Sequence, residues 1–134
     1  MEYRTSTTNI KVRSYHIDSY QHVNNMRYME FLEEARWTHF EGNKTLETVA
    51  KSGVGFVIAN YNIDYLYPAS MDQTLEIKTS LAKMGKKSVV FKQEIFIKEN
   101  QKQALSANVT LVSFDIKTQL PAEITEEMRA EIIK

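Results

Sequence analysis

The stretch NMRYMEFLEEARWTHFE, residues 25–41, decides the fold because it is the one long helical segment of the chain. Side chains recur on one face at helical spacing: Tyr28, Phe31, Leu32, Ala35 and His39. Asn24 and Asn25 stand at its start, and asparagine is a favoured helix N-cap. Gly42 follows it and is suited to end a helix. We therefore expect a helix over 25–41 that covers an apolar surface.

The segments around this helix alternate between apolar and polar residues, which is typical of β-strands. We expect strands over 8–16, 56–67, 73–83, 87–98 and 103–116, a short helix over 44–51, and a C-terminal helix over 121–134 with Pro121 near its start. The predicted apolar face of 56–67 consists of Val57, Ala59, Tyr61, Ile63 and Tyr65, and that of 73–83 of Leu75, Ile77, Thr79 and Leu81.

The order is thus one strand, the long helix and then four strands. One face of the sheet must be covered, and the 25–41 helix is the only long element that can cover it. The residues alone predict an α+β domain in which a curved antiparallel five-stranded sheet wraps around one long helix. Because the 134 residues contain no linker, repeat or low-complexity tract, residues 1–134 are expected to form a single domain.

The composition argues against several function classes. With 17 basic and 17 acidic residues, the chain has no net attraction to nucleic acid or to an anionic membrane. It has no cysteine, which excludes a disulfide, a thiolate zinc site and a cysteine nucleophile. No apolar run reaches the roughly 20 residues of a membrane span, and the N-terminus lacks the apolar core of a signal peptide. His16, His22 and His39 lack metal-site spacing. We expect a cytoplasmic protein without a metal.

The segment VRSYHIDSYQHVNNMRYME, residues 12–30, carries the candidate chemistry. It places Asp18 and His22 between the end of a strand and the start of the long helix. A helix N-terminus presents unpaired backbone N–H groups and the positive end of the helix dipole. Such donors stabilise charge that develops on a carbonyl oxygen. A carboxylate beside them is the minimum arrangement for acyl transfer.

The run D-x-x-x-H-V-N-N-x-x-Y, formed by Asp18, His22, Val23, Asn24, Asn25 and Tyr28, resembles the signature of the hot-dog-fold acyl thioesterases. The similarity is greatest to the 4-hydroxybenzoyl-CoA thioesterase-like branch with its small bacterial acyl-CoA thioesterases, and plant acyl-carrier-protein thioesterases carry a similar segment. EFLEEAR at 30–36, IANYNIDYLYPA, MGKKSVVFKQEI and LPAEI extend the resemblance over nearly the whole chain. The resemblance implies the hot-dog fold and hydrolysis of an acyl-CoA or acyl-carrier-protein thioester, without a cofactor.

The resemblance also implies roles for single residues. Asp18 matches the catalytic aspartate, which acts as the nucleophile or as the base toward water. Asn25 falls where the family places the backbone N–H that polarises the thioester carbonyl. His22 matches the histidine of the plant-type motif, which assists or orients. The sequence departs from the family at three neighbours: His16 replaces an acidic residue, Tyr20 an asparagine and Gln21 the usual glycine.

Further residues are candidates for substrate binding. Tyr20 and Asn24 flank the motif histidine, and Tyr28 belongs either to the core or to the wall of the acyl channel. Lys86, Lys87 and Ser88 lie where related enzymes approach the nucleotide or phosphopantetheine, and such side chains suit phosphate oxygens. A solvated turn is the alternative reading of this cluster.

Trp37 lies opposite the apolar stripe of the long helix and needs cover, which favours self-association. The resemblance implies a homodimer with sheets joined edge to edge, or a homotetramer, with active sites at the subunit boundary. Two other functions stay open. One is a non-catalytic acyl-thioester-binding protein of the same fold. The other is a hot-dog dehydratase or hydratase, although the histidine motif of those enzymes is absent.

Overall fold

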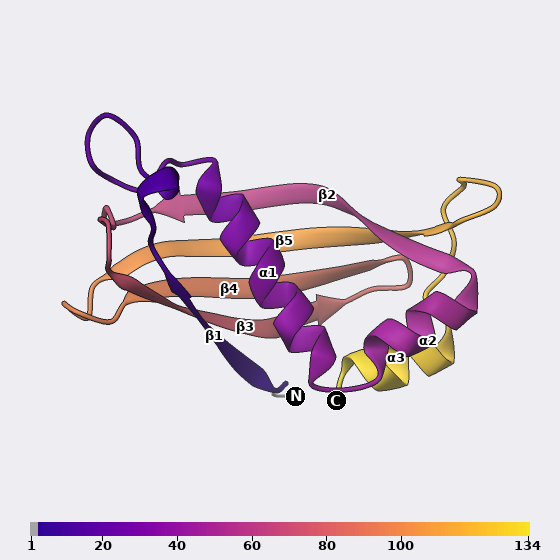
Figure 1. Ribbon diagram of the computed structural model, residues 1–134. Helices are drawn as coiled ribbons and strands as arrows, with labels where there is room; N and C mark the ends of the chain where they lie inside the picture. Colours follow the sequence, from indigo (N-terminus) through magenta and orange to yellow (C-terminus); the bar gives the residue numbers. More distant parts are fainter. Residues whose placement is uncertain (1–2) are drawn as a thin grey trace.

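A computed structural model describes residues 3–134 (Figure 1). The elements are, in order, β1 (Thr5–Lys11), a short 3-10 helix η1 (Ser14–His16), α1 (Arg27–Glu41), α2 (Thr45–Ser52), β2 (Val54–Tyr65), β3 (Thr74–Met84), β4 (Ser88–Ile97), β5 (Gln103–Asp115) and α3 (Glu126–Ile132). The strands form one antiparallel sheet in the order β1-β3-β4-β5-β2. The predicted α+β fold, a curved five-stranded sheet around a long helix, is confirmed.

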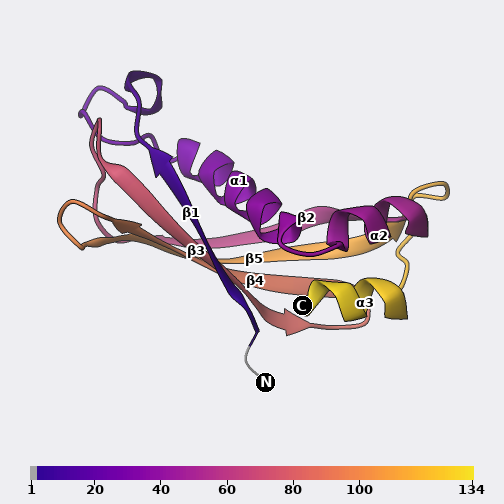
Figure 2. The same ribbon diagram turned by 60° about the horizontal axis from the view of Figure 1, so that its bottom comes forward.

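The helix α1 lies across one face of the curved sheet, as Figures 1 and 2 show. Its predicted stripe is buried, with Leu32 and Ala35 inaccessible to solvent. The sheet supplies the other half of the core, chiefly through Leu75, Ile77, Phe91, Ile95, Leu105 and Val109. Lys78, Lys92 and Asn108 are exposed on the opposite face of the same strands. One apolar face on the sheet and one on the helix therefore account for the arrangement.

The start of α1 differs slightly from the prediction. The helix begins at Arg27 rather than Asn25, and its N-cap residue Met26 makes no side-chain capping bond. Asn24 instead forms the turn before the helix. Its Oδ1 accepts a hydrogen bond from the Met26 N–H at 2.9 Å, and its carbonyl accepts one from the Arg27 N–H at 2.9 Å. The asparagine thus shapes the approach to the helix, because its side chain mimics a turn of backbone.

Two terminal elements are shorter than predicted. The first strand ends at Lys11, not at residue 16, because the His16 Nδ1 accepts a hydrogen bond from the Arg13 N–H and closes the η1 turn. The last helix begins at Glu126, after its N-cap Thr125, whose Oγ1 accepts a hydrogen bond from the Met128 N–H. Pro121 lies outside this helix and forms a bridge with Phe114.

The edge strand β2 changes its facing residues along its length. A register shift between Ile58 and Asn60 inserts Ala59 as an extra residue. Such a bulge reverses the alternation of side chains. The predicted apolar face therefore holds only after the bulge, at Tyr61, Ile63 and Tyr65. Before it, Phe56 and Ile58 turn toward the helices, and Val57 is 48% exposed on the other side, which corrects the prediction.

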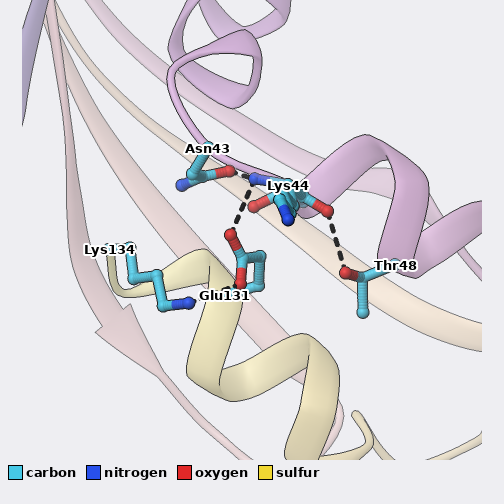
Figure 3. A network of polar contacts seen from close by, with 6 residues as sticks. Asn43, Lys44, Thr48, Glu131 and Lys134 are labelled. Atoms are coloured by element: carbon cyan, nitrogen blue, oxygen red, sulfur yellow. Dashed lines mark hydrogen bonds and ion pairs between the residues drawn. The ribbon is translucent and has the colours of Figure 1, made fainter.

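The two short helices are joined by Glu131 (Figure 3). Its Oε1 accepts a hydrogen bond from the Lys44 N–H at 2.7 Å, and its Oε2 pairs with the Lys134 Nζ at 2.9 Å. These contacts, with Lys134 first, lower the pKa of the Glu131 carboxyl. The carboxylate thereby supplies a partner to a backbone N–H at the start of α2 and fixes α3 beside that helix.

Candidate active site

The loop that carries Asp18 is a tight hairpin between η1 and α1. Ile17 and Val23 form a β-bridge at its neck. The Asp18 N–H donates to the His22 carbonyl at 2.9 Å, and the Gln21 N–H donates to the Asp18 carbonyl at 3.0 Å. Gln21 has a φ of 65°, as expected for the last residue of a three-residue hairpin loop. The hairpin places Asp18 and His22 opposite each other.

This hairpin is anchored to the rest of the domain. His22 bridges to Ser70 in the segment before β3, and the Val23 N–H donates to the Ala69 carbonyl at 2.9 Å. Val23 and Ala69 are buried. On the other side, the Asn24 N–H donates to the His16 carbonyl at 2.9 Å. Because both sides are bonded, the position of the hairpin relative to α1 is determined by the fold.

The Asp18 carboxylate is half-buried and partly engaged. Its Oδ1 accepts a hydrogen bond from the Tyr20 N–H at 2.9 Å, so the side chain also serves as a turn residue. Within residues 3–134 it forms no ion pair. The hydrogen bond to one oxygen therefore orients the carboxylate within the hairpin.

Asn25 presents a backbone donor beside this loop, immediately before α1. Its N–H makes no backbone hydrogen bond within residues 3–134. Its carbonyl accepts a hydrogen bond from the Tyr65 hydroxyl at 3.2 Å, which holds the peptide from the end of β2. A free N–H at the positive end of a 15-residue helix suits a carbonyl oxygen that gains negative charge.

Aromatic side chains pack against one another next to the start of α1. Tyr28 is buried and packs edge-on against Phe31 and in a tilted arrangement against Tyr65. Burial raises the pKa of Tyr28 to about 12. His16 is buried and packs edge-on against Phe31 at 4.8 Å, and burial followed by the charge of Arg27 lowers its pKa. The neutral form of each ring is therefore favoured.

Sequence reasoning missed the supporting roles of His16 and Tyr65. His16 appeared only as a departure from the family pattern, yet its ring closes the turn before the loop and its carbonyl holds Asn24. Tyr65 lies 40 positions from Asn25. Nothing in the spacing signals that contact, because it depends on how β2 passes beside the start of α1.

The structure brings together only part of the predicted site. Asp18, His22, Asn24, Asn25 and Tyr28 gather at one end of the sheet, and Tyr20 lies exposed at the tip of the hairpin. Lys86, Lys87 and Ser88 lie at the turn between β3 and β4. The 11 residues of β3 separate this turn from the hairpin, a distance on the order of 30 Å. Within one chain these two groups do not meet (Figure 1).

An apolar cavity of about 250 Å³ opens between α1, α2 and the sheet. Its wall includes Trp37, Phe40, Val49, Phe56, Phe91 and Leu111. These residues come from the second half of α1, from α2, from the starts of β2 and β4 and from the second half of β5, so the cavity lies toward the end of the sheet that carries Lys86. None of the helices in residues 3–134 is long and apolar enough to cross a membrane. The same residues contain no group of three or more histidines and carboxylates placed to hold a metal ion.

This curved antiparallel sheet wrapped around one long helix is the architecture of the hot-dog fold. The chain belongs to the thioesterase-like superfamily, whose family model matches residues 12–132. It is 39% identical over 125 residues to the long-chain acyl-CoA thioesterase FadM of Escherichia coli, covering 93% of this chain and 95% of that protein.

Solved structures agree with this assignment. The crystal structure of YbaW, a probable thioesterase from Escherichia coli, matches with a TM-score of 0.87 at 38% identity, covering 96% of this chain and 98% of the other. A 4-hydroxybenzoyl-CoA thioesterase solved with 4-hydroxybenzoyl-CoA matches with a TM-score of 0.85 over 98% of this chain and 99% of the other. Because that identity is 18%, the second match shows the fold alone. The family predicted from the motif is confirmed.

Proposed function

We propose that this chain hydrolyses an acyl-CoA or acyl-carrier-protein thioester to a free acid and a thiol. The observation that carries the proposal is the Asp18 carboxylate in an anchored hairpin, whose closing bridge at Val23 lies two residues before Asn25, where the backbone N–H has no partner within residues 3–134. The acyl-CoA thioesterase FadM supports the CoA form of the substrate. A cytoplasmic location is part of the proposal, because acyl-CoA and acyl-carrier-protein thioesters are intracellular metabolites.

The reaction needs an oxyanion donor and one carboxylate. The thioester oxygen accepts a hydrogen bond from the Asn25 N–H, which stabilises the charge of the tetrahedral intermediate. Asp18 either attacks the carbonyl carbon or removes a proton from the water that attacks it. The C–S bond then breaks and the thiolate leaves, taking up a proton. Where water attacks, the free acid forms in this step, and the proton that Asp18 removed passes to the thiolate. Where Asp18 attacks, a mixed anhydride forms on its carboxyl, and a water molecule then hydrolyses it to release the acid and restore Asp18. His22, opposite Asp18 in the hairpin, orients the carboxylate or the water. These steps use no cofactor.

We place the complete site in a homodimer formed through β2. This strand lies at the edge of the sheet, spans 12 residues and exposes Val57, Ile58 and Tyr65. A long exposed edge with apolar side chains is suited to pairing with another strand. A twofold axis would pair it with its own copy in antiparallel orientation.

Antiparallel pairing has a direct consequence for the site. The end of β2 lies beside Asn25, through Tyr65, whereas its start lies beside the cavity, through Phe56. In an antiparallel pair the end of one β2 lies beside the start of the other. The hairpin of one protomer thus approaches the cavity and the Lys86–Ser88 turn of its partner. The acyl chain enters that cavity, and Lys86, Lys87 and Ser88 contact the phosphates of the thiol carrier.

The test is the change Asp18→Asn, which keeps the shape of the side chain and removes its charge. We expect a loss of turnover of roughly a thousandfold on medium- and long-chain acyl-CoA substrates, with unchanged thermal unfolding. Asp72→Asn is the matched control, because Asp72 is an exposed carboxylate in a loop. Its backbone φ is positive, and asparagine tolerates a positive φ as aspartate does. Near-normal turnover of folded Asp18→Asn would refute the assignment.

A further inference from the structure

The cavity beside α1 contains a buried cation without an anion. Arg36 is only 4% exposed and lies on the cavity wall. Its Nη1 donates to the Gln93 Oε1 at 3.0 Å and its Nη2 to the Tyr61 hydroxyl at 2.9 Å. Both acceptors are neutral, and the guanidinium also lies over the Tyr61 ring, 5.5 Å from its centroid, a cation–π contact that brings no counter-charge. Glu33 also lies on the wall, yet none of the ion pairs within residues 3–134 includes Arg36.

A buried charge of this kind calls for a partner. Burying a guanidinium without a counter-charge is costly, and its five N–H groups can bond more than two acceptors. A second polar group on the same wall is also unsatisfied. The Thr45 Oγ1 is buried and has no hydrogen-bond partner within residues 3–134. Because the Thr45 oxygen has no accessible surface, the cavity offers the Arg36 guanidinium alone to a ligand with oxygen acceptors.

The apolar residues of the cavity wall indicate the chemistry of the uncharged part of the ligand. It is formed mainly by aromatic and aliphatic side chains, including Trp37, Phe40 and Phe91. At about 250 Å³ the cavity exceeds the ~150 Å³ that holds a benzene molecule and lies near the lower end of small-molecule sites. It has room for a short or medium hydrocarbon chain. Because Arg36 is positively charged, we expect that chain to carry a carboxylate group.

We propose that this cavity binds a free carboxylic acid, with the hydrocarbon chain among the aromatic residues and the carboxylate paired with Arg36. The inference rests on the proposed function only in making this acid the reaction product. A thioester has no charge at its carbonyl and forms no ion pair, whereas the acid does. The free acid is therefore held more tightly than the acyl group of the substrate. It inhibits the enzyme by occupying the cavity of the acyl chain, with its carboxylate at Arg36, whereas the substrate carbonyl lies at the Asn25 N–H.

Trp37 gives a direct readout of this binding. It is the only tryptophan of the chain, is 51% exposed and lies on the cavity wall. A bromine atom at the far end of a bound chain quenches its fluorescence. We would titrate the protein at neutral pH with 8-bromooctanoic acid and, in parallel, with 8-bromooctan-1-ol. We expect saturable quenching by both, with the acid bound roughly ten- to a hundredfold more tightly because of its charge-assisted hydrogen bonds.

Variants separate the charge from the cavity. Arg36→Gln should abolish the preference for the acid, and Arg36→Lys should retain most of it. Val49→Phe, which fills the cavity without touching Arg36, should weaken both ligands at least tenfold. Arg27→Gln is the matched control, because Arg27 lies on the same helix, is exposed and is remote from the cavity wall. It should behave as the wild type.

Three results would overturn the proposal: equal affinity for acid and alcohol in the wild-type protein, no quenching by either, or an acid preference that survives in Arg36→Gln. If Arg36→Gln does not fold, the wild-type comparison and Arg36→Lys still decide. The titrations involve no turnover. Failure of the thioesterase proposal would appear in the Asp18→Asn assay, and failure of the acid site would appear here.

Discussion

At the scale of single residues, the hairpin that carries Asp18 is strained at Gln21. Its φ of 65° lies in the left-handed region, where a side chain is disfavoured by about 1 kcal/mol. Glycine, the residue that the family resemblance leads one to expect at this position, carries no such penalty. The departure from the family pattern therefore affects the stability of the hairpin and leaves its shape intact.

We predict that Gln21→Gly stabilises the protein by roughly 0.5 kcal/mol, because relief of the left-handed strain exceeds the entropy that glycine gains in the unfolded chain. Ser19→Gly in the same loop is the control. Ser19 has no positive φ, so glycine should destabilise the protein at that position. Urea unfolding of both variants measures the difference. Equal destabilisation by the two changes would contradict the account of the loop.

A second residue links stability to pH. His39 is 2% exposed, its Nδ1 lies 2.7 Å from the Ser6 Oγ, and burial followed by the charge of Arg4 lowers its pKa to about 4. The unfolded chain protonates this ring near its ordinary pKa of 6.5, whereas the folded protein does not. The folded pKa is the lower one, so this contribution to stability is complete above pH 6.5 and is lost as the pH falls toward 4.

We therefore predict that the free energy of unfolding decreases by about 3 kcal/mol from this residue between pH 7 and pH 4. Urea unfolding at a series of pH values measures the slope. His39→Gln should flatten that slope, although it lowers the stability at pH 7. His22→Gln, a change at an exposed histidine, should leave the slope as it is. A wild-type slope that His39→Gln leaves unaltered would show that another group is responsible.

At the scale of elements, the β3–β4 turn is the part of the predicted site that lies far from the Asp18 hairpin within one chain. Lys86 and Lys87 are exposed, and the backbone around them is held from two sides. The Lys86 carbonyl accepts from the Ile124 N–H at 2.8 Å, and the Lys87 carbonyl accepts from the Ser113 N–H at 3.0 Å. The turn is thus held in place, and its two ammonium groups form no ion pair within residues 3–134, which suits contact with phosphates.

The double change Lys86→Gln and Lys87→Gln is expected to raise KM for acyl-CoA roughly three- to tenfold, because exposed charge pairs are screened but still attract phosphate. The same acyl group on pantetheine, which lacks the nucleotide, should show a smaller change. Steady-state kinetics with both thioesters gives the comparison. Lys44→Gln with Lys51→Gln, on α2, is the control. An equal rise of KM for both thioesters would show that the nucleotide does not contact Lys86 and Lys87.

At the scale of the whole molecule, the open edge of β2 is the surface through which we propose that two protomers pair. Asn60 lies near the middle of this strand, directly after the bulge. In an antiparallel pair of β2 strands related by a twofold axis, the middle of one strand lies beside the middle of the other. Side chains near residue 60 would then face their own copies.

We predict that Asn60→Lys converts a dimer into a monomer, because it places like charges next to each other at the axis. Turnover should fall together with the dimer fraction, since the proposed site uses residues of both protomers. Light scattering during size-exclusion chromatography gives the mass. Asn108→Lys, the same change on the neighbouring central strand β5, should stay dimeric. A monomeric wild-type enzyme with full activity would refute the dimeric site.

The order of the elements and the family could be predicted from the sequence because both depend on local patterns. The stripe from Tyr28 to His39 requires a helix, and the alternation of Leu75, Ile77, Thr79 and Leu81 requires a strand with one buried face. The run from Asp18 to Tyr28 is likewise contiguous. Element boundaries were less predictable, because side-chain hydrogen bonds at His16 and Thr125 set them.

Only the tertiary structure decided which distant residues meet. Tyr65 holds the Asn25 peptide, Gln93 and Tyr61 bond Arg36, and the Ala59 bulge turns Phe56 toward the helices. These contacts join residues far apart in the chain, and no local periodicity encodes them. They depend on the curvature and register of the sheet, which arise from the packing of all five strands against α1 at once.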